Sequence, residues 1–244
     1  MSSPKSLEKL LSIKRKKIEI EAYRSITRGI PRKKIFWEKE FSSAEEAILD
    51  RYADLNNTLS LEPQEEKDHW YHMGQNENLS FCFDAVDLSP SRFGDGFPVW
   101  YGSKTFEGSK AEVIYHLQRQ AQRELAHTKN EDSIVFDRAL FKAKVHLVSA
   151  LDLREEASNK SSNLLEDGPP YPFCSSLGKM AKDSGSDGIL SLSKRAHPDE
   201  LTAVFDKNAV KSSKVIAYWD AEFTKKGEVY VCSEKWPSDK NTEL

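Results

Sequence analysis

The chain has 244 residues, 38% of them apolar, and a formal net charge of −3. This length and apolar content allow one substantial buried core. No apolar run reaches membrane-spanning length and no export signal opens the chain, so we expect a soluble protein of the cytoplasm. The odd, widely spaced cysteines Cys82, Cys174 and Cys232 favour a reducing compartment over a disulfide scaffold or a structural zinc site.

The beginning of the chain is strongly basic. Residues 1–34 contain eleven Lys or Arg against three Glu, so they carry +8 and the remaining residues −11. Three leucines share one face of a basic helix predicted within residues 1–17: Leu7, Leu10 and Leu11. Such a helix can contact nucleic acid or an acidic partner. Because no aromatic interleaving or DNA-reading motif accompanies the charges, a solvated helix face is favoured and nucleic acid is not expected as a partner.

Alternation of Ile18, Ile20 and Ala22 with two glutamates predicts a strand that delivers Tyr23 and Arg24. The other predicted elements follow in chain order: a helix at 43–52, strands at 79–86 and 98–102, a helix at 109–126, a strand at 141–147, a mobile loop at 154–170, a short helix at 173–180, and strands at 187–192, 201–206, 214–219 and 227–232. This mixture of short strands and helices predicts a single α+β domain. We place it at residues 18–232, followed by a polar tail at 233–244.

The segment from Arg92 to His116 carries the most chemistry. It sets Arg92, Tyr101 and Glu112 at near-even spacing across a predicted strand, loop and helix. A guanidinium binds phosphate, an aromatic ring packs on a flat base, and a carboxylate accepts from a ribose hydroxyl. These are the groups that a nicotinamide dinucleotide requires.

Glu112 has two competing interpretations. A carboxylate beside an anomeric carbon stabilises the oxocarbenium character that develops during glycosidic cleavage. The pattern Ser109-x-x-Glu112 is also that of a capping box, in which the glutamate bonds back to the start of its helix. On the residues alone the capping box is favoured. Glu107 is a rival carboxylate that we rank below Glu112.

The remaining candidates also have ordinary alternatives. Arg92 precedes a Gly-x-Gly turn that lets backbone approach a ligand, yet arginines beside loops are usually surface residues. Tyr101 ends a predicted strand, where a tyrosine is more often part of the core. His69 and His72 have metal-like spacing, but no third ligand stands nearby, so a metal site is not expected.

Four segments in order resemble the RES domain, a family named for its arginine, glutamate and serine. Residues 92–116 are similar to the core of that domain. The run from Asp187 to Arg195 resembles its element "DGI, two residues, Ser, one residue, Arg", which places the serine at Ser193, with Ser191 as a competitor. Residues 201–205 (LTAVF) are similar to the next strand, and the stretches at 22–38 and 47–57 are similar to the opening of longer members.

The resemblance implies roles for individual residues. Glu112 would be catalytic, which reverses the preference for a capping box, and Tyr101 would pack on the nicotinamide. Arg92 would hold the pyrophosphate together with an N-terminal arginine, for which we prefer Arg24 over Arg28. In the same scheme, Ser193 would brace the ribose.

The resemblance also implies a fold similar to that of ADP-ribosyltransferase toxins and an enzyme that uses NAD as its substrate, with no further cofactor. The leading expectation is an NAD glycohydrolase, and the close alternative is an ADP-ribosyltransferase that modifies a protein. An antitoxin or immunity protein is the partner implied, with action in the cytosol and delivery to another cell left open. A different class of function, a non-catalytic binding module using the basic N-terminus, remains as a further alternative.

Overall fold

The structure is a computed structural model that describes residues 4–27, 82–83, 91–127, 132–158, 163–166, 171–227 and 229–236. The predicted helix at 43–52, Arg28, and the histidine pair at 69 and 72 lie outside the described residues. Of the predicted strand at 79–86 only Cys82 and Phe83 are described, and both are helical, so the prediction is wrong at those positions. Within the described ranges, no helix combines the length and apolar character needed to cross a membrane.

The described strands form one seven-stranded sheet in the order β1-β2-β5-β4-β3-β6-β7. Their bounds are β1 (Lys16–Thr27), β2 (Trp100–Ser103), β3 (Ser133–Asp152), β4 (Gly188–Leu192), β5 (Glu200–Val204), β6 (Val210–Lys226) and β7 (Val229–Lys235). An additional pairing of β1 with β3 closes β1, β2, β5, β4 and β3 into a ring of neighbours. The β3–β4 pair is parallel and the other pairs are antiparallel, so the sheet is mixed.

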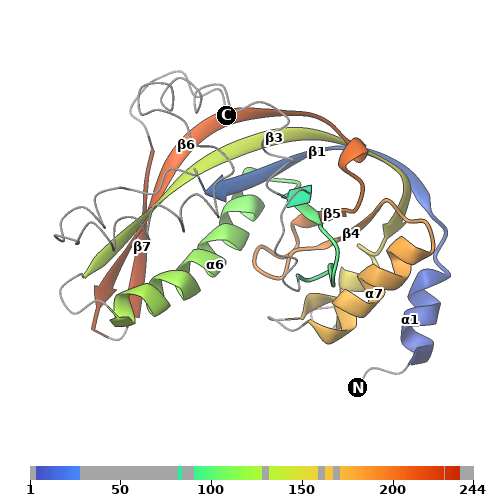
Figure 1. The fold of residues 1–244 in the computed structure, drawn as a ribbon, viewed down its shortest axis with the longest axis horizontal. Coiled ribbons are helices and arrows are strands. Elements are labelled where there is room, and N and C mark those ends of the chain that lie inside the picture. Colours follow the sequence, from blue (N-terminus) through green and yellow to red (C-terminus); the bar gives the residue numbers. More distant parts are fainter. Residues whose placement is uncertain are drawn as a thin grey trace, which may run out of the picture. The chain divides into compact units, whose positions relative to one another are not determined.

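Helices lie against different parts of this sheet. The helical elements are α1 (Pro4–Leu11), α6 (Phe106–His127) and α7 (Pro172–Asp183), with short 3₁₀ turns η1 (Glu156–Ser158), η2 (Asn163–Leu165) and η3 (Lys207–Ala209). In Figure 1, α6 lies under the long strands β3 and β6, whereas α7 and α1 lie beside each other near β4 and β5. The combination of helices with a mixed sheet confirms the predicted α+β class.

Two apolar clusters hold these helices in place. Leu117 and Ala121 of α6 pack with Leu140 of β3 and Trp219 of β6. Leu177 of α7 belongs to a second cluster, with residues from β4 and β5. The three leucines of α1 pack against that second cluster. The N-terminal helix is therefore attached to the core through its apolar face.

The segment predicted as a mobile loop at 154–170 is packed where the structure describes it. Three of its residues are buried, at 0%, 1% and 4% exposure: Ala157, Leu164 and Leu165. They sit in η1 and η2 and contribute to the cluster around α7. Polar residues dominate the segment, but a few apolar side chains are enough to anchor it. The predicted mobility is therefore wrong for these residues.

Candidate active site

A cavity of about 1020 Å³ is lined by residues of β1, β2, α6 and the loop between β4 and β5. This volume is at the upper end of pockets that hold small ligands, about 300–1,000 Å³. Arg24, Arg92, Tyr101 and Glu112 all line it, although they come from distant parts of the chain. The structure therefore brings together four of the predicted site residues, and Ser193 contacts one of them directly.

Glu112 belongs to the second turn of α6, and it does not cap the helix. The helix begins at Phe106, and the Thr105 hydroxyl accepts a hydrogen bond from the Gly108 N–H at 3.0 Å. Thr105 is thus the capping side chain, and the predicted capping box of Ser109 with Glu112 is wrong. Because the helix starts three residues earlier than predicted, Glu112 is free to face the cavity.

The Ser193 hydroxyl is bound within the protein. It donates to Oε1 of Glu112 at 2.7 Å and accepts from the N–H groups of Arg195 at 3.1 Å and Ala196 at 3.0 Å. A hydroxyl has one proton and two lone pairs, so this set uses its full capacity. In this geometry Ser193 orients the carboxylate of Glu112. Ser191, the competitor, is buried within β4 and does not line the cavity.

The Tyr101 hydroxyl forms hydrogen bonds that hold the turn at residues 91–94 in place. It accepts a hydrogen bond from the Phe93 N–H at 2.7 Å and shares one with the Ser91 hydroxyl at 3.0 Å. Burial raises the pKa of Tyr101 to about 12, against the lowering effect of these two hydrogen bonds. The phenol therefore stays neutral at physiological pH, and its ring forms part of the cavity wall.

The guanidinium of Arg92 is held by hydrogen bonds within the protein, so it is less free to bind phosphate than an exposed arginine would be. Arg92 as a whole is only 8% exposed. Nη1 donates to the carbonyl of Leu192 at 3.1 Å, and Nη2 donates to the carbonyl of Leu164. Nε is buried and has no hydrogen-bond partner among the residues that the structure describes. Arg92 thus joins the end of β4 to η2 while placing its positive charge at the cavity.

Arg24 projects from β1 into the same cavity. Its Nη1 donates to the carbonyl of Tyr101 at 3.1 Å, and its guanidinium lies 5.6 Å from the centre of the Trp100 ring. Arg138 on β3 donates to the Ser25 carbonyl at 2.8 Å. Burial lowers the pKa of Arg138 to about 9, and the charge of Arg24 contributes to the same shift. The positive charge of Arg24 on the cavity wall therefore disfavours the charged form of its neighbour Arg138.

The structure adds basic residues that the sequence analysis did not identify. Arg195 and Arg119 stack on the ring of Tyr115, with 3.3 Å and 4.8 Å between guanidinium carbon and ring centre. Six basic residues line the cavity within the described ranges: Arg24, Arg92, Arg119, Arg123, Lys194 and Arg195. The acidic ones there are Glu112 and Glu166, so the described lining has a net charge of +4. A multiply charged anion matches this lining.

A periodic pattern along α6 is the signal that could have found several of these residues. Glu112, His116, Arg119 and Arg123 follow at intervals of three or four, which places them on one face of a helix. All four line the cavity. Desolvation lowers the pKa of His116, helped by Arg195 and Arg119 and opposed by Glu112.

Glu166, the second acidic residue of the cavity lining, accepts hydrogen bonds at the start of α7. Its two carboxylate oxygens accept from the N–H groups of Phe173 at 3.0 Å and Cys174 at 2.9 Å, at the start of α7. A carboxylate at this end of a helix is favoured by the helix dipole. Glu112 is therefore the acidic side chain of the described lining that does not cap a helix.

The wall that carries Arg92 and Tyr101 is packed directly on α7. A Cβ atom on residue 178 would collide with the carbonyl oxygen of Phe93, so glycine permits this approach of helix and turn. The N–H of Phe93 is held at the same time by the Tyr101 hydroxyl. The backbone at Phe93 is thus fixed by contacts from α7 and from β2.

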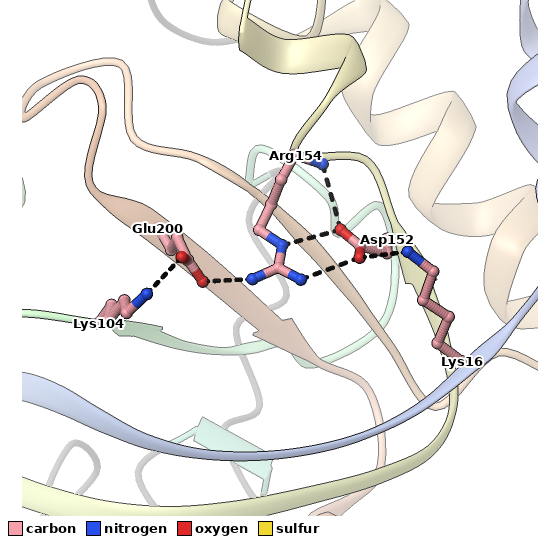
Figure 2. A network of polar contacts seen from close by, with 5 residues as sticks. All are labelled: Lys16, Lys104, Asp152, Arg154 and Glu200. Atoms are coloured by element: carbon pink, nitrogen blue, oxygen red, sulfur yellow. Dashed lines mark hydrogen bonds and ion pairs between the residues drawn. The ribbon is translucent and has the colours of Figure 1, made fainter.

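A chain of ion pairs joins strands near the cavity (Figure 2). Arg154 lies in the middle, with Nε 2.9 Å from Asp152 Oδ1 and Nη1 2.6 Å from Glu200 Oε2. Lys16 extends the chain from Asp152 at 2.9 Å, and Lys104 extends it from Glu200 at 2.6 Å. Hydrogen bonds from Arg154 lower the pKa of Asp152 well below its usual range. The network links β1, β3 and β5.

The protein is thus α+β, and its basic cavity surrounds one carboxylate that is oriented by a buried hydroxyl. A family model, the RES domain, matches residues 66–224, and the chain therefore belongs to the RES domain family. No curated protein sequence matches the chain. Among solved structures, a chain of the M. tuberculosis MbcT–MbcA toxin–antitoxin complex is similar, with a TM-score of 0.43 and 11% identity over 87% of this chain and 92% of that chain.

Proposed function

We propose that the cavity binds NAD and that this protein cleaves the bond between nicotinamide and ribose, with water as the acceptor. Membership of the RES domain family supports a toxin-like protein that acts on NAD. The observation that carries the specific reaction is the carboxylate of Glu112, which lines a basic cavity and is held by the Ser193 hydroxyl at 2.7 Å.

The charge distribution of the cavity supports a dinucleotide ligand. NAD carries two negative charges on its pyrophosphate, and the described lining has a net charge of +4. Arg195 and Arg119 are held against Tyr115, so their guanidiniums are ordered before a ligand arrives. A guanidinium can donate to two phosphate oxygens at once. In this proposal these two residues share the pyrophosphate with Arg24, and Arg92 supports the wall behind it.

The proposed chemistry needs one well-placed anion. The bond between C1′ of the ribose and the pyridinium nitrogen breaks, and its electron pair stays on nicotinamide, which leaves as a neutral molecule. C1′ then has oxocarbenium character, which the negative charge of Glu112 stabilises. A water oxygen bonds to C1′, and the proton that this water loses passes through Glu112 to solvent. Nicotinamide, ADP-ribose and one proton are the products.

The test is incubation of the purified full-length protein with NAD and separation of the products by chromatography. We expect nicotinamide and ADP-ribose in equal amounts. Glu112→Gln should lower kcat by about 100-fold or more while NAD binding changes little, because its charge is required mainly in the transition state. Glu124→Gln is the matched control, since Glu124 lies on the same helix, is exposed and does not line the cavity.

Each outcome of this experiment decides between the candidate functions. Full NAD cleavage by Glu112→Gln would refute the role of Glu112. Nicotinamide release without free ADP-ribose, and with label from NAD on a protein, would favour an ADP-ribosyltransferase. If no nicotinamide is released, the alternative of a non-catalytic binding module is favoured. The proposal also includes an antitoxin or immunity protein as the partner, because many RES domains are the toxin half of such a pair.

A further inference from the structure

We infer that β7 and Trp236, which lie beyond the family match, position Glu112 for catalysis; this inference rests on the proposed NAD cleavage. The match to the family model ends at residue 224, inside β6. The chain then returns as β7, which pairs with β6 from Lys226↔Val229 to Asp220↔Lys235. This strand and Trp236 therefore add to the family core at the side of the sheet that faces α6.

The Trp236 ring joins the sheet to the beginning of α6. It stacks on Trp219 of β6, with ring centres 5.5 Å apart and 11° between the planes. It also meets Phe106, the first residue of α6, edge to face at 5.2 Å and 79°. Trp219 is 2% exposed, so the stack rests on the core. Both arrangements are favourable geometries for aromatic pairs.

An ion pair adds a second contact between β7 and α6. Lys110 Nζ lies 3.2 Å from Glu234 Oε2 and 2.8 Å from Glu107 Oε2. The side chains of Lys110 and Glu234 are 19% and 28% exposed, so this pair is partly shielded from solvent. The first two turns of α6 are thus held by both an aromatic contact and a charged one.

The Lys110 contact lies on the face of α6 opposite to Glu112, and Phe106 lies about 120° around the helix from Glu112. At 100° per residue, position 112 is about 200° around the helix from position 110. On the cavity face, Glu112 meets Ser193 at 2.7 Å. A helix moves as a unit over two turns, so loss of the outer contact shifts Glu112 relative to Ser193 and the bound sugar. Trp236 is therefore a positioning residue, because it does not line the cavity.

The test compares Trp236→Ala with Trp236→Phe in the full-length protein. We expect kcat for NAD cleavage to fall about tenfold in the alanine variant with KM nearly unchanged, since a displacement of about 1 Å can cost up to 100-fold in rate. The phenylalanine variant keeps an aromatic ring against Phe106 and should restore most of kcat. Glu234→Gln, a milder change, should lower kcat in the same direction by a smaller factor. A rise in KM with kcat unchanged in the alanine variant would overturn the inference.

A double-mutant cycle separates positioning from general destabilisation. If Trp236 acts through the Ser193–Glu112 contact, Trp236→Ala should lower kcat much less when Ser193→Ala is already present. Independent, multiplying effects would overturn the inference.

Amide hydrogen exchange in α6 gives a readout that does not depend on activity. We expect faster exchange at residues 106–112 in Trp236→Ala than in Trp236→Phe. Equal exchange in the two variants would refute the positioning role even if the enzyme is active. If the unmodified protein does not cleave NAD, the proposed function is refuted. The hydrogen-exchange comparison would still show whether Trp236 stabilises the beginning of α6.

Discussion

A single hydroxyl organises the catalytic centre that we propose. Ser193 is fully buried and sits at the end of β4, where two backbone N–H groups of the following turn point at its oxygen. Those two donors fix where the oxygen lies, and the remaining proton is directed at Glu112. The position of the carboxylate is thus set by backbone geometry two and three residues farther along the chain.

At the residue scale we predict that Ser193→Ala lowers kcat by about tenfold or more, with a smaller effect on KM. The substitution removes the donor to Glu112 and leaves two backbone N–H groups without their acceptor, which is costly for buried groups. Steady-state kinetics with NAD would measure the effect, and thermal unfolding would show how much of it is loss of folded protein. Wild-type kcat in a folded Ser193→Ala protein would contradict the proposed orientation of Glu112.

Residue types predicted which side chains meet at one cavity more reliably than they predicted the contacts of those side chains. Arg92, Tyr101 and Glu112 were chosen for phosphate, base and sugar, and the structure places all three at one cavity. Their partners could not be read from sequence. The groups that bind Arg92 are carbonyls of Leu192 and Leu164, and carbonyls carry no residue signature. Long-range backbone partners depend on the finished fold.

At the scale of elements, α6 shows how one side chain fixes a boundary. Both Thr105 and Ser109 fit the sequence signature of a helix start. In the structure Thr105 caps the helix, and only Lys104 and Thr105 separate the end of β2 from the start of α6. The sequence favoured Ser109 because a glutamate follows it at the spacing of a capping box. Phe106, the first residue of the helix, also packs against Trp236, a long-range contact that the local sequence pattern does not reveal.

We predict that Thr105→Ala lowers the free energy of unfolding by about 1 kcal/mol, the typical cost of losing an N-terminal cap. Thr105→Ser should retain most of the stability because it keeps the hydroxyl that accepts from Gly108. Urea unfolding followed by tryptophan fluorescence would measure both values. Equal stability of the alanine and serine variants would mean that another residue caps α6.

Apart from the strand expected at 79–86, where residues 82 and 83 are helical, the predicted strands were right in position and wrong in extent. The alternation at residues 141–147 marked only part of β3, which runs for 20 residues. β3 is buried on both faces toward its end, at Ala150, Leu151 and Asp152, so the two-residue period that identifies a half-exposed strand disappears there. The apolar cluster around α7 covers one side of that end and residues of β1 and β4 cover the other.

At the scale of the whole chain, ion pairs between distant segments contribute to stability in a pH-dependent way. Asp152 has a side chain that is 7% exposed and is paired with Lys16 and Arg154. Its pKa in the folded protein is lowered, chiefly by hydrogen bonds from Arg154. A carboxyl group with a depressed folded pKa stabilises the fold above its unfolded pKa, and this contribution disappears as the pH falls through the folded value.

We therefore predict that Asp152→Asn is less stable than the unmodified protein at pH 7, by about 2 kcal/mol, because Lys16 and Arg154, which are partly exposed, lose the buried carboxylate that pairs with them. The difference between the two proteins should shrink as the pH falls below about 4, where Asp152 of the unmodified protein begins to titrate in the unfolded state. Chemical unfolding at several pH values would measure it. A constant difference down to pH 2 would show that the charge of Asp152 does not contribute to stability.

The close packing of Gly178 on Phe93 has a consequence for the energetics of ligand capture. Since α7 and the phenol of Tyr101 hold that turn from two directions, this wall of the proposed binding cavity is formed before a ligand enters. A receptor with a prebuilt surface loses little conformational freedom on association, so more of the contact energy remains available for affinity. A larger side chain at residue 178 would push α7 away from the turn at Phe93. The cavity wall would then have to be re-formed each time a ligand binds.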